Sequence, residues 1–218
     1  MHAKRNFTHL NVSSAYSLRF GTALPEKIVS QAKQLNFSKI ALTDQDTLSG
    51  AINFVQHCLT QEITPIIGVD FNLGRSRALV LARGKNGWTD LCRLVSKAHE
   101  KERGKPQLDV LDLWEKMQKG NLVTILGVNS DIGQSVLRNR NDLASNLLNN
   151  WLSNVDRNDL VIEIVAHPNL HKVVDPKYSI STAARLTAFA RDNRLKAILT
   201  NAVRYVTAED AIVAELLD

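Results

Sequence analysis

The sequence predicts an α/β protein built around a mainly parallel sheet, and two observations support this fold class. Short apolar runs of strand length recur along the 218 residues, and each is followed by a stretch in which apolar residues have helical spacing. Some runs, such as 66–67 and 161–165, are apolar on both faces, as in parallel strands covered by helices. Seven such units fit a closed or nearly closed barrel, and an open doubly wound sheet is the alternative.

The individual elements follow from the same periodicity. Strands are expected at 7–12, 39–43, 65–71, 77–82, 121–127, 160–165 and 196–200. Amphipathic helices are expected at 25–34, 48–59, 88–98, 108–117, 132–148, 181–192 and 208–217. Pro25 suits the first turn of its helix, because an N–H at that position would have no helical partner. The charged segment 100–107 and the proline-containing segment 167–178 are expected to be loops.

The composition is that of an ordinary soluble domain. Hydrophobic residues make up 44% and charged residues 22% of the chain, which excludes disordered and fibrous proteins. A formal charge of +5, spread along the chain, permits a nucleic-acid partner without requiring one. No apolar run is long enough to span a membrane and no targeting signal follows the basic residues in 1–6, so a cytoplasmic protein is expected. Cys58 and Cys92 lie in predicted helices and are expected to be buried, reduced thiols.

Polar residues gather at the carboxyl ends of the predicted strands, where parallel barrels bind their ligands. They are His9, Asn11, Asp44, Gln45, Asp46, Asp70, Glu163 and His167. A lone His9 is explained more simply as a hydrogen-bonded core residue than as a metal ligand. Asp46 precedes a predicted helix and could cap it. Asp44 has no equally simple structural explanation, and Asp70 should be paired or exposed.

Taken in order, these segments resemble the polymerase-and-histidinol-phosphatase (PHP) domain of bacterial DNA polymerase III alpha subunits. The family's His-x-His, Thr-Asp-His-Asp, Pro-Ile-Ile-Gly-x-Glu, Gly-Trp and Thr-Asn-Asp-Val-His-Tyr motifs correspond to His9-Leu10-Asn11, Thr43-Asp44-Gln45-Asp46, Pro65-Ile66-Ile67-Gly68-Val69-Asp70, Gly87-Trp88 and Thr200-Asn201-Ala202-Val203-Arg204-Tyr205. The resemblance implies a distorted (βα)7 barrel over residues 1–218, at the amino terminus of a longer polymerase. It extends to the error-prone polymerases of actinobacteria.

The resemblance also implies a metal site whose ligands have mostly been replaced. The positions are His9, Asn11, Phe20, Gln45, Asp70, Arg77, Val128, Ala202 and Arg204. The family's histidines are replaced here by Asn11, Gln45 and Arg204, and its aspartates by Phe20 and Ala202. A further histidine position is occupied by Arg77, and a later ligand position by Val128. Because arginine has no acceptor for a cation, we expect no metal and no catalytic residue in this domain, and Mg²⁺ only in a polymerase core. Arg77 and Arg204 are expected to pair with Asp44 and Asp70, or to hold an anion such as phosphate.

Three functions remain open from the residues. The preferred one is a structural module of a DNA polymerase in replication or repair, whose partners are the other polymerase domains and DNA, with no membrane. The alternative is a metal-dependent phosphoesterase with a reduced site of His9, Asp44, Asp70, Glu163 and His167. A third is a nucleic-acid-binding barrel that uses Arg75, Arg77, Arg83, Lys85 and the basic segment 97–105, although such charges commonly form a solvated face. Trp88 and Trp114 are expected in the core or an interface.

Overall fold

Strands and helices alternate along the chain, as the periodicity predicts. The computed structural model describes residues 7–100, 102, 104–167 and 175–217. The elements in order are α1 (Pro25–Gln34), β1 (Lys39–Leu42), α2 (Ala51–Thr60), β2 (Thr64–Asn72), β3 (Arg77–Ala82), α3 (Gly84–Ala98), α4 (Val110–Met117), β4 (Leu122–Leu126), α5 (Asp131–Leu137), α6 (Asn141–Leu152), β5 (Leu160–Val165), α7 (Ile180–Asp192), β6 (Lys196–Thr200) and α8 (Ala211–Leu217). Short 3₁₀ turns precede β5, α7 and α8.

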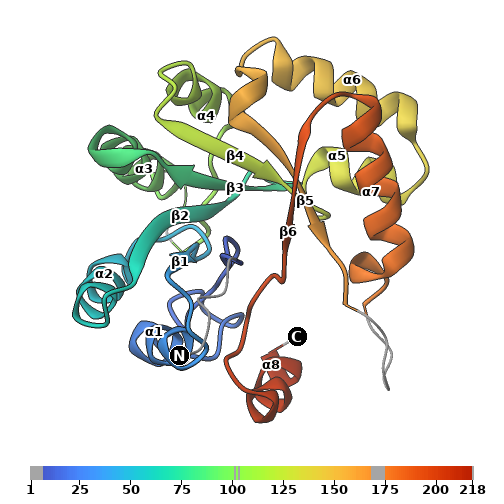
Figure 1. The fold of residues 1–218 in the computed structure, drawn as a ribbon. Coiled ribbons are helices and arrows are strands. Elements are labelled where there is room, and N and C mark those ends of the chain that lie inside the picture. Colours follow the sequence, from blue (N-terminus) through green and yellow to red (C-terminus); the bar gives the residue numbers. More distant parts are fainter. Residues whose placement is uncertain (1–6, 101, 103, 168–174, 218) are drawn as a thin grey trace. The chain divides into compact units, whose positions relative to one another are not determined.

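The chain forms two compact units, of which the first contains residues 1–70 and 202–218. Within it, β1 pairs in parallel with β2, from Lys39 opposite Thr64 to Leu42 opposite Ile67. The α1 helix packs against α2 and β1, and Figure 1 shows these elements in blue to cyan. The buried core of this unit includes Val12, Val29, Phe54 and Cys58. Pro25 occupies the first turn of α1, as expected.

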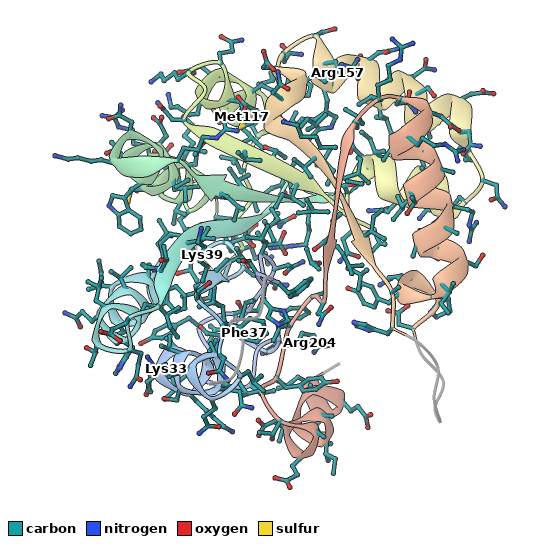
Figure 2. All side chains as sticks on the ribbon, in the orientation of Figure 1. Lys33, Phe37, Lys39, Met117, Arg157 and Arg204 are labelled. Carbon is teal, nitrogen blue, oxygen red and sulfur yellow. The ribbon has the colours of Figure 1, made fainter. Side chains whose placement is uncertain are left out.

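The second unit contains residues 71–201, and its described residues form the four strands β3 to β6. β3 runs antiparallel to β4, whereas β4, β5 and β6 are parallel neighbours. α3 packs on β3, α4 on β4, and α7 on both β5 and β6 (Figure 1). Met117, at the end of α4, is buried in this unit (Figure 2). These pairings establish a mixed α/β fold.

The strand predicted at 7–12 is not a regular strand. On one side of this segment the amides of Ala41 and Thr43 donate to the carbonyls of His9 and Val12, and on the other side the amide of Val203 donates to the carbonyl of Asn11. Only Val12 forms an isolated bridge, with Val203. Its backbone therefore has partners on both sides, but too few consecutive pairs to form a ladder.

The single helix predicted at 132–148 is two helices. α5 ends at Leu137 and α6 begins at Asn141, because Asn139 adopts a left-handed backbone conformation with φ of 57°. Arg185 of α7 stabilises this break by donating to the carbonyl oxygen of Leu137 and to Oδ1 of Asn139. The apolar periodicity continues through the break, so the sequence pattern does not indicate where the helix is interrupted.

Several boundaries agree with the prediction and others shift by a few residues. α1, β3, β5 and β6 have the predicted bounds, whereas α2 begins at Ala51 because Ser49 and Gly50 form a turn first. Residues 1–6 and parts of the predicted loops 100–107 and 167–178 lie outside the described residues. In the described part of the chain, no helix combines the length and apolar character that crossing a bilayer requires.

Candidate functional site

Asp44 is separated from the end of β1 by Thr43 alone and is buried. Its carboxylate accepts hydrogen bonds from the amide of Ser14 at 2.7 Å and from the hydroxyl of Ser14 at 2.8 Å. The hydroxyl of Ser17 donates to the same carboxylate at 2.7 Å and accepts from the amide of Gln45 at 3.0 Å. A Cβ added at Gly50 would lie 3.2 Å from Oδ2 of Asp44, so little space remains around the carboxylate. Serine donors thus enclose the carboxylate.

Burial and these hydrogen bonds act on Asp44 in opposite directions. Burial removes water from the carboxylate and raises its pKa, whereas the bonds from Ser17 and Ser14 lower it, and burial is the larger effect. The net direction is upward from the usual value. A buried carboxylate with three neutral donors is stabilised as a structural group, because its acceptor sites are occupied by protein atoms.

Gln45, Asp46 and Asp70 are linked through their main chains. Gln45 forms an isolated parallel bridge with Asp70, the amide of Asp70 donates to the carbonyl of Asp44, and the amide of Asp46 donates to the carbonyl of Asp70. Asp46 does not cap α2, the simpler of the two roles that the sequence left open for it, because Gly50 is the N-cap of this helix. Instead Asp46 is buried with a positive φ of 55°, a conformation that aspartate tolerates better than most residues.

His9 lies among aromatic and apolar side chains. Its ring contacts Phe7 and Phe37 edge to face, with both centroids 4.9 Å away. Figure 2 labels Phe37. In the described part of the chain Nδ1 is buried without a hydrogen-bond partner, which differs from the hydrogen-bonded core histidine expected from the sequence. Burial lowers the pKa of this imidazole, so the neutral form is favoured.

Arg204 occupies a replaced histidine position and contacts Phe20, which occupies a replaced aspartate position. Its guanidinium lies 4.3 Å from the centroid of the Phe20 ring, and its Nε donates to the carbonyl of Phe20 at 3.3 Å. Its Nη2 donates to the carbonyl of Ala214 in α8, also at 3.3 Å. Arg204 is labelled in Figure 2. The side chain therefore joins three segments of the first unit. Nearby Ala202 has a φ of 46°, a left-handed conformation unfavourable for alanine.

The remaining predicted positions belong to the second unit. Arg77 begins β3, and its amide donates to the carbonyl of Asn129, while Val128 is buried after β4. Glu163 is buried in β5 and accepts from the hydroxyl of Thr200 at 2.5 Å. A ring nitrogen of His167 lies 3.1 Å from the carbonyl of Asn201.

The side chain of Glu163 occupies the space beside Gly127 where a Cβ would lie. A Cβ at Gly127 would lie 2.2 Å from a carboxylate oxygen of Glu163, so no other residue fits without movement. The Ser130 hydroxyl, which caps α5, donates to the carbonyl of Gly127 at 2.7 Å. Glu163 is thus part of a packed corner at the carboxyl ends of β4, β5 and β6.

The basic residues expected at a nucleic-acid-binding face are partly neutralised. Arg83 pairs with Asp159, Lys97 with Glu100 at 3.5 Å, and Lys105 with Glu102 at 2.7 Å. Trp114 contacts Trp151 edge to face at 5.6 Å, in agreement with a packing role. Cys58 is buried and Cys92 half-buried, and burial raises the pKa of Cys58 to about 12, so that thiol is unreactive.

The structure does not assemble the predicted ligand positions into a metal centre within the residues it describes, since no three His, Cys, Asp or Glu residues there lie close enough together to hold an ion. The pairing of Arg77 and Arg204 with Asp44 and Asp70 stays a prediction. Sequence reasoning missed Ser14 and Ser17, which hold Asp44. Their only signal was two hydroxyl residues in a segment next to the first predicted strand.

Comparison with known proteins adds family information. A family model described as the PHP domain matches residues 9–167. DNA polymerase III subunit alpha of Borreliella burgdorferi is 29% identical over 233 residues, which cover 100% of this chain and 20% of the relative. Error-prone DNA polymerase of Mycobacterium bovis is 34% identical over 116 residues, covering 47% of this chain and 11% of the relative. The chain thus spans about a fifth or less of the length of these relatives.

Two solved structures share the fold. An amidohydrolase from Chromobacterium violaceum, solved with bound sulfate and no metal, gives a TM-score of 0.64 at 13% identity and covers 93% of this chain and 89% of its own. A candidate metal-dependent phosphoesterase from Bifidobacterium adolescentis gives 0.61 at 12% identity, covering 90% and 87%. At these identities the likeness concerns the fold alone.

Proposed function

This chain belongs to the PHP domain family, and on that premise we propose that it is the amino-terminal PHP domain of a bacterial DNA polymerase III alpha subunit, with a mainly structural role. The relatives that align along its length are polymerase subunits, and the alignment with the Borreliella burgdorferi protein covers the whole chain. We further propose a cytoplasmic protein with a distorted (βα)7 barrel, whose partners are the other polymerase domains and, through them, DNA. The polymerase core would use Mg²⁺. Both a DNA polymerase III alpha subunit and error-prone DNA polymerases are among the relatives.

The contact between Arg204 and Phe20 supports the proposed structural role. Both residues stand at positions where the PHP family has metal ligands. In this chain the guanidinium of Arg204 instead lies over the Phe20 ring and donates to the Phe20 carbonyl. An arginine and a phenylalanine offer no ligand atom to a cation, and a fixed positive charge repels one. Arg204 donates hydrogen bonds to the carbonyls of Phe20 and Ala214 and so joins separate segments of the chain. A bound metal ion would join segments in the same way. Metal-dependent phosphoesterase activity is the less supported alternative.

The test uses the complete protein encoded by the reading frame that contains this sequence. We expect Mg²⁺-dependent primer extension from it, and no phosphoesterase activity when Mn²⁺ or Zn²⁺ is added. Arg204→Ala should lower the midpoint of thermal unfolding while leaving primer extension at low temperature unchanged, because the contact is structural. Arg138→Ala, an exposed arginine on the second unit, is the matched control. Phosphoesterase turnover that requires added metal, or a protein without primer extension, contradicts the proposal.

A further inference from the structure

A polar pocket of about 360 Å³ lies on the second unit, beside the carboxyl end of β4. Its walls come from the turn between β2 and β3, which supplies Asn72, Arg75, Ser76 and Arg77, and from Asn129 and Gln134 next to and within α5. The carboxyl ends of parallel strands are where α/β proteins bind ligands. None of the described residues that line the pocket is acidic.

The main chain around the pocket is held in place by the residues that line it. The side chain of Asn72 accepts from the amide of Gly74 at 2.9 Å and donates to the carbonyl of Pro106 at 2.9 Å. Gly74 has a φ of 91°, which glycine adopts without strain. These contacts fix the shape of the turn that carries Arg75 and Ser76.

A second set of contacts joins this turn to α5. Nε2 of Gln134 donates to the carbonyl of Arg75 at 3.0 Å and to the carbonyl of Asn129 at 3.1 Å. The amide of Arg77 also donates to the carbonyl of Asn129, at 2.9 Å. The backbones of Arg75 and Asn129 are therefore fixed relative to one another before any ligand arrives, which reduces the entropy lost on binding.

Three polar side chains of the pocket are available for binding. In the described part of the chain, the Arg75 guanidinium, the Ser76 hydroxyl and the Asn129 side-chain amide take part in no hydrogen bond or ion pair. All three can donate hydrogen bonds, and the guanidinium matches an oxyanion with two parallel N–H groups. Arg77 lines the same pocket.

We propose that this pocket binds a phosphate group without a metal, with Arg75, Ser76 and Asn129 as its donors. The protein donors replace the cation as the source of positive charge and hydrogen bonds. Phosphate can come from inorganic phosphate or from the backbone of single-stranded DNA, and both present the same oxygens. The DNA source rests on the proposed polymerase function, whereas the phosphate site itself does not.

The experiment measures binding of inorganic phosphate by calorimetry, and of a labelled short oligothymidylate by fluorescence anisotropy, to the 218-residue chain at low salt. We expect Arg75→Ala to weaken affinity by about tenfold, because a charge-assisted hydrogen bond is lost, and Ser76→Ala by about threefold. Arg138→Ala serves as the control, because Arg138 is an exposed arginine of the same unit outside the pocket, and its effect should stay within about twofold.

Each outcome of these binding measurements supports or refutes the phosphate site. Binding of either ligand that depends on Arg75 but not on Arg138 supports the site, and the ligand that binds identifies the source of the phosphate. If neither ligand binds at millimolar concentration, or if both arginine variants weaken binding equally, the site is refuted. Primer extension by the complete protein is measured separately, so loss of the phosphate site is distinguishable from failure of the proposed polymerase function.

Discussion

His9 is enclosed by Phe7 and Phe37, and this environment makes its charge state depend on folding. Burial lowers the pKa of His9 in the folded protein, whereas an unfolded chain has the usual value of about 6.5. As pH falls through this value, the unfolded chain binds a proton that the folded chain does not. Stability therefore falls as pH is lowered, until the folded imidazole is protonated as well.

His9→Phe should remove this dependence, because phenylalanine does not titrate and suits the aromatic surroundings. We expect the loss of unfolding free energy between about pH 7.5 and about pH 5.5 to be smaller in the variant than in the unsubstituted protein. Urea unfolding followed by circular dichroism at both pH values measures it. His57→Phe, at an exposed position of α2, is the control. Equal pH dependence in the His9 variant and the unsubstituted protein would show that His9 is not the titrating group.

Asp44 and Arg204, two residues of the candidate site, have hydrogen-bond partners that lie far from them in the sequence. Asp44 is adjacent to the replaced ligand position of Gln45, and Arg204 occupies another such position. Each makes hydrogen bonds within the first unit. Asp44 could be recognised in the sequence as a polar residue after a strand. Its donors Ser14 and Ser17 could not, because small hydroxyl residues are common in every kind of segment.

At the scale of elements, the break between α5 and α6 shows how one residue overrides periodicity. Asn139 has a φ of 57°, and its Oδ1 accepts from Arg185 at 2.9 Å. Asparagine tolerates the left-handed region better than most residues, and this conformation ends a helix. Arg185 then satisfies the last carbonyl of α5.

Asn139→Ala should destabilise the protein by about 1–2 kcal/mol, because alanine lacks the acceptor and is strained in the left-handed region. Asn139→Gly should cost less, since glycine adopts this conformation freely and loses only the contact with Arg185. The measurement is the free energy of unfolding in urea. Asn146→Ala, an exposed position within α6, should change it by less than about 0.5 kcal/mol. An alanine variant as stable as the glycine variant would contradict this account of the break.

At the scale of the whole molecule, each of the two units buries an apolar core of its own. The first core includes Val12 and Phe54, and the second includes Leu122 and Trp151, all buried. Asp44 and Glu163, the buried carboxylates at the strand ends, accept hydrogen bonds from serine and threonine hydroxyls. The described part of the chain thus supplies protein donors to both carboxylates, and we therefore expect its stability not to depend on metal coordination.

Removal of metal should therefore leave stability unchanged. We expect treatment with EDTA followed by dialysis to shift the midpoint of thermal unfolding by less than about 1 °C. Loss of an ion present at about a hundred times its dissociation constant would instead remove about 2.7 kcal/mol and lower the midpoint by several degrees. Differential scanning calorimetry, with elemental analysis of the untreated protein, separates these outcomes. A lower midpoint that is restored by Zn²⁺ or Mn²⁺ would show that the protein holds a metal.

The sequence by itself determined the α/β class, the bounds of α1, β3, β5 and β6, and the family, because periodicity and motif order are local properties of the chain. Only the tertiary structure decided that 7–12 is not a strand, that serines hold Asp44 and that Arg204 stacks on Phe20. Ser14 and Asp44 are 30 residues apart, and Arg204 and Phe20 are 184 apart. Contacts over such separations depend on how packed elements bring distant segments together, which no local pattern records.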